Sequence, residues 1–199
     1  MSLRNPLGDA LITEPQAMRA LAHPLRLAAL SYLQRHGPAT ATQLAPHVGA
    51  SPSVTSWHLR HLARFGLVVD ADPSEVPGDR RQRWWKAPAR GFRVELGDSD
   101  DAAAAGRVLN DQLIDTARRQ VDVWVGETEP RLDYAWRRLA GVSNTSVRLT
   151  AAELETVENA IDDLLGRYVT RAEPDVPADA RRVRVLRYFL PSEGPEADQ

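Results

Sequence analysis

Two short helical patterns separated by a tight break define the most informative stretch of the chain, from Ala41 to Val69. Apolar positions recur at the spacing of one helix face, first at Leu44, Ala45 and Val48 and then at Thr55, Leu59 and Leu62. Gly49 lacks a Cβ atom and can take the left-handed conformation that ends a helix. Ser51 is typical of an N-cap, and Pro52 suits the first position of the helix that follows. The pattern predicts a helix-turn-helix whose second helix ends near Gly66.

The polar side of that second helix has the character of a surface that meets nucleic acid. Five of its residues share this side at spacings of three and four, namely Ser53, Ser56, Trp57, Arg60 and Arg64. No acidic residue occurs between Ala41 and Val69, and a carboxylate here would be repelled by phosphates. The alternative is the solvated face of an ordinary small helical domain.

The flanking sequence predicts more helices and a β-hairpin. Met1 to Asp9 shows no pattern. We expect two further helices, one capped by Thr13 and interrupted at His23-Pro24 and one from Pro24 to Gly37, and Thr40 can cap the first helix of the helix-turn-helix. After Gly66 the apolar period changes, and short strands are expected at 67–69 and 83–87 around a Pro- and Gly-containing loop.

Three segments together resemble the ArsR-type winged-helix regulators: HPLRLAALSYL, then ATQLAPHVGASPSVTSWHLRHLARFGLV, then RRQRWWKA. The likeness covers about residues 14–92, and it is greatest to the branch with a Ser-aromatic-His-Leu run, here residues 56–59. It implies a dimeric transcription regulator whose helix from Ser51 onward enters the major groove of DNA. One departure concerns Thr55, which stands where the family has an apolar β-branched residue. Val54 would then be free to contact a thymine methyl group.

Three arginines of the expected hairpin, Arg80, Arg81 and Arg83, are further candidates for DNA contact. In a winged helix such side chains reach phosphates or a minor groove, whose negative potential attracts them. The alternative is a solvated loop, which the acidic residues nearby partly support.

The second half is predicted to be helical with a small β element. Helices are expected at about 101–126, at 129–141 and, after a Thr150–Glu153 capping box, up to about Val169. Residues 146–149 and 182–190 are rich in β-formers. Four aromatic residues could line an effector pocket or form core or dimer packing: Trp124, Tyr134, Trp136 and Tyr168. The predicted fold is α+β and mostly helical, with a winged helix-turn-helix domain at 10–93 and a helical dimerisation or effector region at 94–192.

Charge separates the same two halves. Residues 1–93 hold 12 basic and 6 acidic residues, whereas residues 94–199 hold 13 basic and 21 acidic ones. The first half is therefore the part suited to a polyanion. The chain has no cysteine, no long apolar run and no secretory pattern at its N-terminus, so we expect a cytoplasmic protein without membrane contact.

Catalytic and metal chemistry are not predicted. No G-x-S-x-G, phosphate-binding glycine loop or H-E-x-x-H occurs, so no enzyme is expected. His47, His58 and His61 could bind zinc in principle, but no cysteine or carboxylate completes the set. The usual metal sites of ArsR proteins do not carry over either, because no histidine follows His61. No cofactor or metal is expected.

The sequence thus predicts a transcription regulator that binds specific double-stranded DNA as a homodimer, with repression as the expected outcome. Two alternatives remain. One is a regulator gated by a small-molecule effector bound in the second half. The other is a winged helix used only for contact with other proteins.

Overall fold

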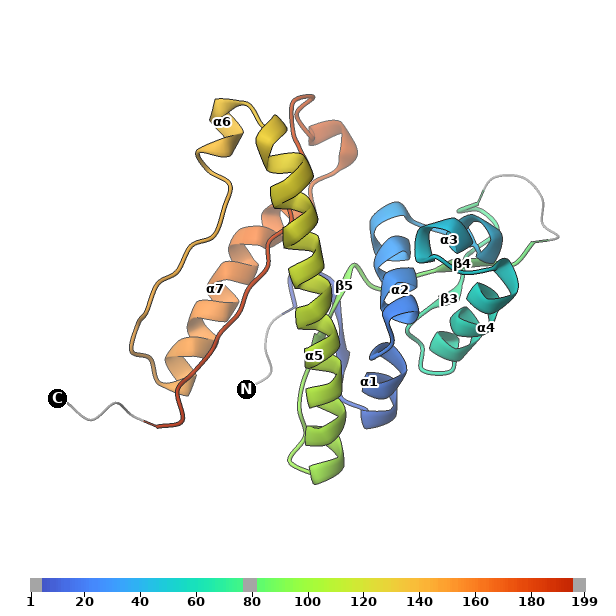
Figure 1. Cartoon of the computed structure of the whole chain (residues 1–199), viewed down its shortest axis with the longest axis horizontal. Coiled ribbons are helices and arrows are strands. Elements are labelled where there is room, and N and C mark those ends of the chain that lie inside the picture. Colours follow the sequence, from blue (N-terminus) through green and yellow to red (C-terminus); the bar gives the residue numbers. More distant parts are fainter. Residues whose placement is uncertain (1–4, 77–81, 195–199) are drawn as a thin grey trace.

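A computed structural model describes residues 5–76 and 82–194, the side chain of Glu173 excepted. A long helix, α5, stands in the middle of the molecule (Figure 1). The helices of the first half lie to one side of it, and α7 lies on the other side. The arrangement confirms the predicted α+β class and the winged helix-turn-helix.

Four helices form the first half, as the sequence predicted: α1 (Pro15–Leu21), α2 (Pro24–His36), α3 (Ala41–Val48) and α4 (Pro52–Ala63). Prolines occupy the first turns of α1, α2 and α4, where a missing N–H leaves no hydrogen bond unmade. The expected Thr13 cap is wrong. Glu14 is the N-cap of α1, and its side chain makes no capping bond.

Two small sheets accompany these helices. The order β2-β4-β3 joins β2 (Ala39–Thr40), β4 (Trp84–Lys86) and β3 (Val69–Asp70) as antiparallel strands. The predicted hairpin is therefore present, with β2 as a third strand. A second sheet, which the sequence did not predict, pairs β1 (Asp9–Ile12) in parallel with β5 (Gly91–Val94).

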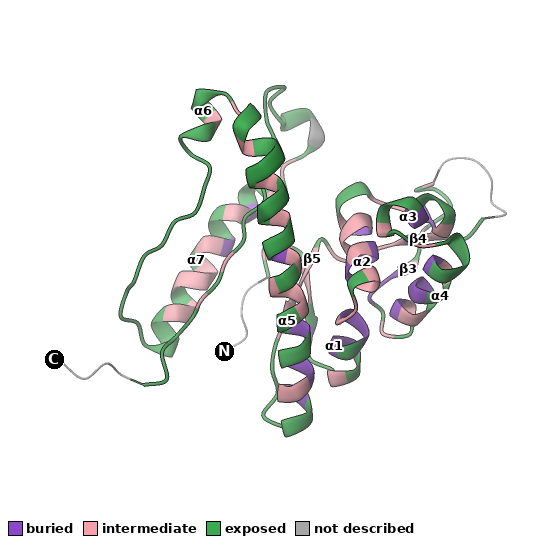
Figure 2. Ribbon diagram, in the orientation of Figure 1, coloured by how far each residue is buried: buried purple, intermediate pink, exposed green. Residues whose placement is uncertain are grey.

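One core lies between the helices of the first half and continues onto α5 (Figure 2). Its largest members, each at most 2% exposed, are Met18, Leu21, Leu30, Leu33, Leu44, Leu59, Leu62, Trp85 and Leu109. Small residues of α5, including Ala105 and Gly106, are also buried and let this helix pack on α1. A Cβ atom added at Gly106 would overlap Leu96, so the Leu96 side chain would have to shift to admit a larger residue.

The second half is helical, with α5 (Asp100–Val123), a π-helical turn (Trp124–Thr128), 3-10 turns (Glu129–Arg131 and Glu173–Asp175), α6 (Tyr134–Arg137) and α7 (Ala151–Val169). The Thr150–Glu153 capping box is confirmed. The predicted β element is wrong: residues 146–149 and 182–190 form no strand. A strand needs a partner whose backbone completes its hydrogen bonds, and neither segment has one.

A buried carboxylate attaches α7 to the first half. Asp162 of α7 is fully buried and accepts hydrogen bonds from Arg93 of β5 and from Arg187 of the C-terminal segment. Asp9 of β1 approaches the same arginine, with 3.6 Å between its Oδ2 and the Nε of Arg93. Burial raises the pKa of Asp9, against the opposing pull of Arg93. This group of four residues is called the Asp162 cluster below.

Many apolar side chains of the second half remain exposed, in contrast to the first half (Figure 2). Examples are Val108 at 54%, Leu139 at 73% and Tyr134 at 74% exposure. Among the described residues, no helix combines the length and apolar character needed to cross a membrane.

Candidate nucleic-acid interface

The turn between α3 and α4 is built by local hydrogen bonds. Thr40 and Gln43 form a capping box at the start of α3. Gly49 has a φ of 66°, the left-handed conformation that a Cβ atom would disfavour. Ser51 then caps α4, its Oγ accepting a hydrogen bond from the Val54 N–H at 3.4 Å. The turn therefore confirms the cap chemistry expected from the sequence, and it fixes the direction in which α4 leaves the core.

The inner face of α4 holds the helix against the domain. Thr55, Leu59 and Leu62 are fully buried, as predicted. The Thr55 hydroxyl donates to the Ser51 carbonyl oxygen at 2.9 Å, which satisfies its polar group within the core. Threonine can therefore occupy this inward position, and Val54 is left at the surface with 44% exposure.

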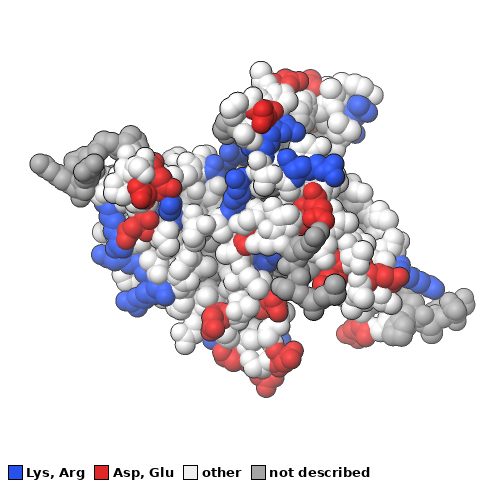
Figure 3. Space-filling model, turned by 180° about the vertical axis from the view of Figure 1, so that it is seen from behind, with Lys and Arg blue, Asp and Glu red and all other residues white. Residues whose placement is uncertain are grey.

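The outer face of α4 brings together the five residues that the sequence assigned to it, and Ser51 and Val54 lie beside them. Six are exposed (Ser51, Ser53, Val54, Trp57, Arg60 and Arg64), and Ser56 is half-buried. Among the described residues, none pairs with the guanidinium group of Arg60 or Arg64, so both cations are free to meet an anion. Basic side chains are visible at this end of the molecule in Figure 3.

Aromatic stacking supports the outer face from beneath. The Trp57 ring lies over His61, with ring centroids 5.7 Å apart and planes 22° from parallel, and meets His58 edge-on at 4.8 Å. His58 in turn lies 4.7 Å from His23, which caps α2 by accepting from the Leu25 N–H. Burial lowers the pKa of His23, His58 and His61, and the cation of Arg26 lowers each further. These three neutral rings connect the start of α2 to α4.

Sequence reasoning did not reveal the contact of His58 with His23. The ring contact crosses from α4 to the turn before α2, and only the fold brings these segments together. As for metal binding, the described residues contain no group of three or more potential His, Cys, Asp or Glu ligands. His47 packs instead on Tyr32 of α2, with ring centroids 4.6 Å apart.

The hairpin strands differ in their bounds from the predicted 67–69 and 83–87, since β3 is Val69–Asp70 and β4 is Trp84–Lys86. Arg83 lies just before β4 and donates to both oxygens of Asp70 on β3, at 2.6 and 3.1 Å. Its guanidinium also covers the Trp85 ring, 3.9 Å from the centroid. The hydrogen bond from Arg83 lowers the pKa of Asp70. Arg80 and Arg81 lie outside the described residues, so their contact with DNA stays a prediction.

The four aromatic residues that the sequence singled out in the second half form no buried core within the described part of the chain, and their role in an effector pocket or a dimer contact stays a prediction. Tyr134 and Tyr168 are 74% and 60% exposed, and Trp124 and Trp136 are half-buried. Arginine side chains lie over two of the rings, Arg171 over Tyr168 and Arg181 over Trp136. A cavity lies elsewhere, between α2, α3 and α5.

Comparison with known families supports the helix-turn-helix. A family model described as a helix-turn-helix domain matches residues 21–70, a range that runs from the end of α1 through α4 to β3. No curated protein matches the chain. The match confirms the motif deduced from residues 41–69 and indicates a DNA-binding regulator. The finer likeness to ArsR-type proteins stays a prediction.

Proposed function

We propose that the protein is an ArsR-like, dimeric transcription regulator that binds specific duplex DNA through α4 and the β3–β4 hairpin. The observation that carries the proposal is the outer face of α4, which combines free arginines, serines and an exposed tryptophan without any carboxylate. The absence of acidic residues in fact extends from Pro15 to Val69. A surface used only for contact with other proteins has no physical reason to exclude carboxylates, so this face favours DNA over that alternative.

The proposed complex places α4 in the major groove, which has room for one α-helix. Arg60 lies beyond the first turn of α4 on the outer face, where it can form two hydrogen bonds to a guanine. Val54 can contact a thymine methyl group, and Arg64 can bind a phosphate. Arg83 would have to exchange Asp70 for a phosphate, so its contribution to affinity is the difference between two ion pairs.

The dimer is proposed on the exposed apolar residues of the second half. Val108, Val121, Val123 and Val125 of α5 and its π-helical turn are all exposed, as is Leu164 of α7. A second copy related by a two-fold axis would cover the same residues on both chains. The apolar face of α1 is not part of this proposed contact, because it already packs on α5 of the same chain. Two α4 helices of such a dimer would read half-sites about one helical turn apart.

Repression is proposed on the resemblance alone. No catalytic activity is proposed, because the sequence has no G-x-S-x-G, phosphate-binding glycine loop or H-E-x-x-H motif.

Selection from a random pool of duplex DNA with the purified full-length protein tests the proposal. A specific sequence should be enriched, and fluorescence anisotropy at one fixed salt concentration should then show a loss of about 1–3 kcal/mol for Arg60→Ala. Arg131→Ala is the matched control, because Arg131 is exposed in the 3-10 turn before α6 and should leave affinity unchanged. A pool without enrichment, or a folded Arg60→Ala variant with wild-type affinity, would overturn the assignment.

A further inference from the structure

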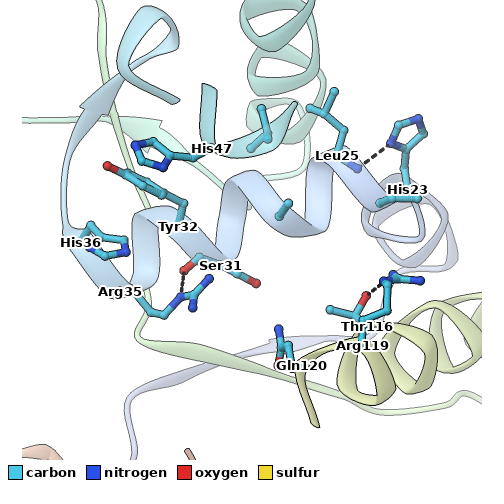
Figure 4. Close-up of a pocket in the computed structure, with 13 residues that line it drawn as sticks. His23, Leu25, Ser31, Tyr32, Arg35, His36, His47, Thr116, Arg119 and Gln120 are labelled. Atoms are coloured by element: carbon cyan, nitrogen blue, oxygen red, sulfur yellow. Dashed lines mark hydrogen bonds between the residues drawn. The ribbon is translucent and has the colours of Figure 1, made fainter. Parts of the chain in front are cut away.

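The cavity between α2, α3 and α5 has a volume of about 700 Å³, within the range of small-molecule sites. Figure 4 shows its two sides. Tyr32, His36 and His47 lie next to one another on one side, and α5 contributes Thr116, Arg119 and Gln120 on the other. The proposed DNA contacts use none of these residues.

The wall formed by α2 and α3 is aromatic. The Tyr32 ring lies between two imidazoles, with centroids 4.4 Å from His36 and 4.6 Å from His47, and both ring pairs are tilted by less than 40°. Such a row offers a flat ligand a surface on which to stack. Aromatic stacking alone would not select between neutral and charged ligands, so selectivity depends on the other residues of the cavity.

Those other residues carry positive charge without a counterion. No acidic residue lines the cavity, whereas Arg35 and Arg119 do. Among the described residues, no carboxylate forms an ion pair with either arginine. Arg35 donates only to the Ser31 carbonyl oxygen, at 3.1 Å, and Arg119 only to the Thr116 hydroxyl, at 3.2 Å. Each guanidinium therefore keeps donors for a ligand.

A third arginine increases the positive charge at the edge of the cavity. Arg184 of the C-terminal segment donates to the Gln120 side chain, and Arg182 donates to the Arg35 carbonyl oxygen at 3.0 Å. Burial and the nearby cation of Arg35 lower the pKa of Arg184. Positive charges held together without an acid are unfavourable, and a bound anion would relieve this repulsion.

We propose that this cavity binds an aromatic organic anion, which packs against the row of rings and is held by Arg35 and Arg119. Guanidinium groups match the geometry of a carboxylate or phosphate through paired N–H donors, and the row of rings supplies the apolar surface. The site lies in the first half and α5, not among the aromatic residues of the second half.

The position of the cavity indicates a regulatory role, and this part rests on the proposed DNA-binding function. His47 belongs to α3, whose turn sets the direction of α4, whereas Arg119 belongs to α5, which leads into the second half. A ligand bound to both helices would stabilise one arrangement of α3 relative to α5 and so change the affinity of α4 for DNA.

Calorimetry on the full-length protein without DNA tests the site. The probes are 2-naphthoate, its neutral amide and inorganic phosphate. We expect saturable binding of 2-naphthoate below about 1 mM, with the amide and phosphate each weaker by about tenfold or more. Arg119→Met should reduce naphthoate affinity by a similar factor. Arg118→Met is the matched control, because Arg118 neighbours Arg119 but is exposed and pairs with Asp115 outside the cavity. Tyr32→Phe should retain binding, since it keeps the ring.

Three outcomes would overturn the site: no saturable binding of naphthoate, equal affinity for acid and amide, or unchanged affinity in a folded Arg119→Met variant. The regulatory part has its own readout, the affinity for the selected DNA sequence with and without saturating naphthoate. We expect a change of about fivefold or more in the wild type and none in Arg119→Met. If saturating naphthoate leaves the DNA affinity of the wild type unchanged, the regulatory role is wrong but the binding site stands. If the protein does not bind DNA at all, the proposed function is wrong, and the calorimetric result for the site is unaffected.

Discussion

Replacing Asp162 with alanine should weaken the attachment of α7 more than any other single charge removal in the second half. The change deletes both oxygens that accept from Arg93 and Arg187, whose side chains are 18% and 27% exposed. Removing one partner of a buried ion pair costs about 3–5 kcal/mol, because the remaining charge is left uncompensated. Here both arginines reach some solvent and Asp9 remains near Arg93, so we expect about 3 kcal/mol. Asp162→Asn keeps one acceptor oxygen and should cost about half as much.

Urea denaturation at one fixed protein concentration measures the total effect, and hydrogen exchange locates it. Amides of α7 and β5 should exchange faster in Asp162→Ala, whereas those of α3 and α4 should keep their protection. Asp111→Ala, at an exposed position of α5, serves as the control and should stay within about 0.5 kcal/mol of the wild type. If Asp162→Ala matches this control in both measurements, the cluster does not hold α7 in place.

Further predictions concern pH, assembly and salt. Burial lowers the pKa of three histidines in the folded protein below 6.5. As the pH falls through this value, these side chains take up protons more readily in the unfolded chain than in the folded protein, so the free energy of unfolding should decrease. His23→Asn keeps a capping acceptor and should make this decrease smaller in urea titrations between about pH 7.5 and 5.5. Light scattering at micromolar concentration should report about twice the 22.0 kDa chain mass, and Val108→Asp should shift the protein toward the monomer; a wild-type monomer would refute the dimer. Replacing Arg80, Arg81 and Arg83 together with alanine should reduce the salt dependence of DNA affinity by up to about three units per subunit while keeping the preferred sequence. An unchanged slope would exclude these arginines from phosphate contact.

The parts of the fold that the sequence predicted well depend on neighbours along the chain. Thr40, Ser51 and Thr150 each cap a helix by bonding a backbone N–H three residues later, so their signals are complete within one turn. The apolar period of α4 likewise identified its inner and outer faces. These features can be predicted without knowing which residues distant in sequence lie nearby in the fold.

The features that the sequence did not reveal depend on distant segments. β1 and β5 are four residues each and become strands only by pairing with each other. Residues 182–190 have the composition of a strand, but composition without a partner does not make one. Asp162 accepts a hydrogen bond from Arg93, which is 69 positions away in the sequence. The position of Asp162 in an amphipathic helix pattern does not indicate that contact. The basic cavity was missed for the same reason, because α2, α3 and α5 all contribute to it.

The parallel pairing of β1 with β5 has a consequence for the order in which the protein folds during synthesis. Parallel strands cannot be joined by a tight turn, and here all four helices of the first half lie between them. The contacts within α2, α3 and α4 are closer along the chain and can form while β5 is still unmade. β1 can pair only after Gly91 to Val94 have been synthesised, and α1 can pack on α5 only after Ala102 to Leu109 have been synthesised. A ribosome that stalls before these residues would hold a chain with α2, α3 and α4 formed but the apolar face of α1 uncovered, a species prone to aggregation.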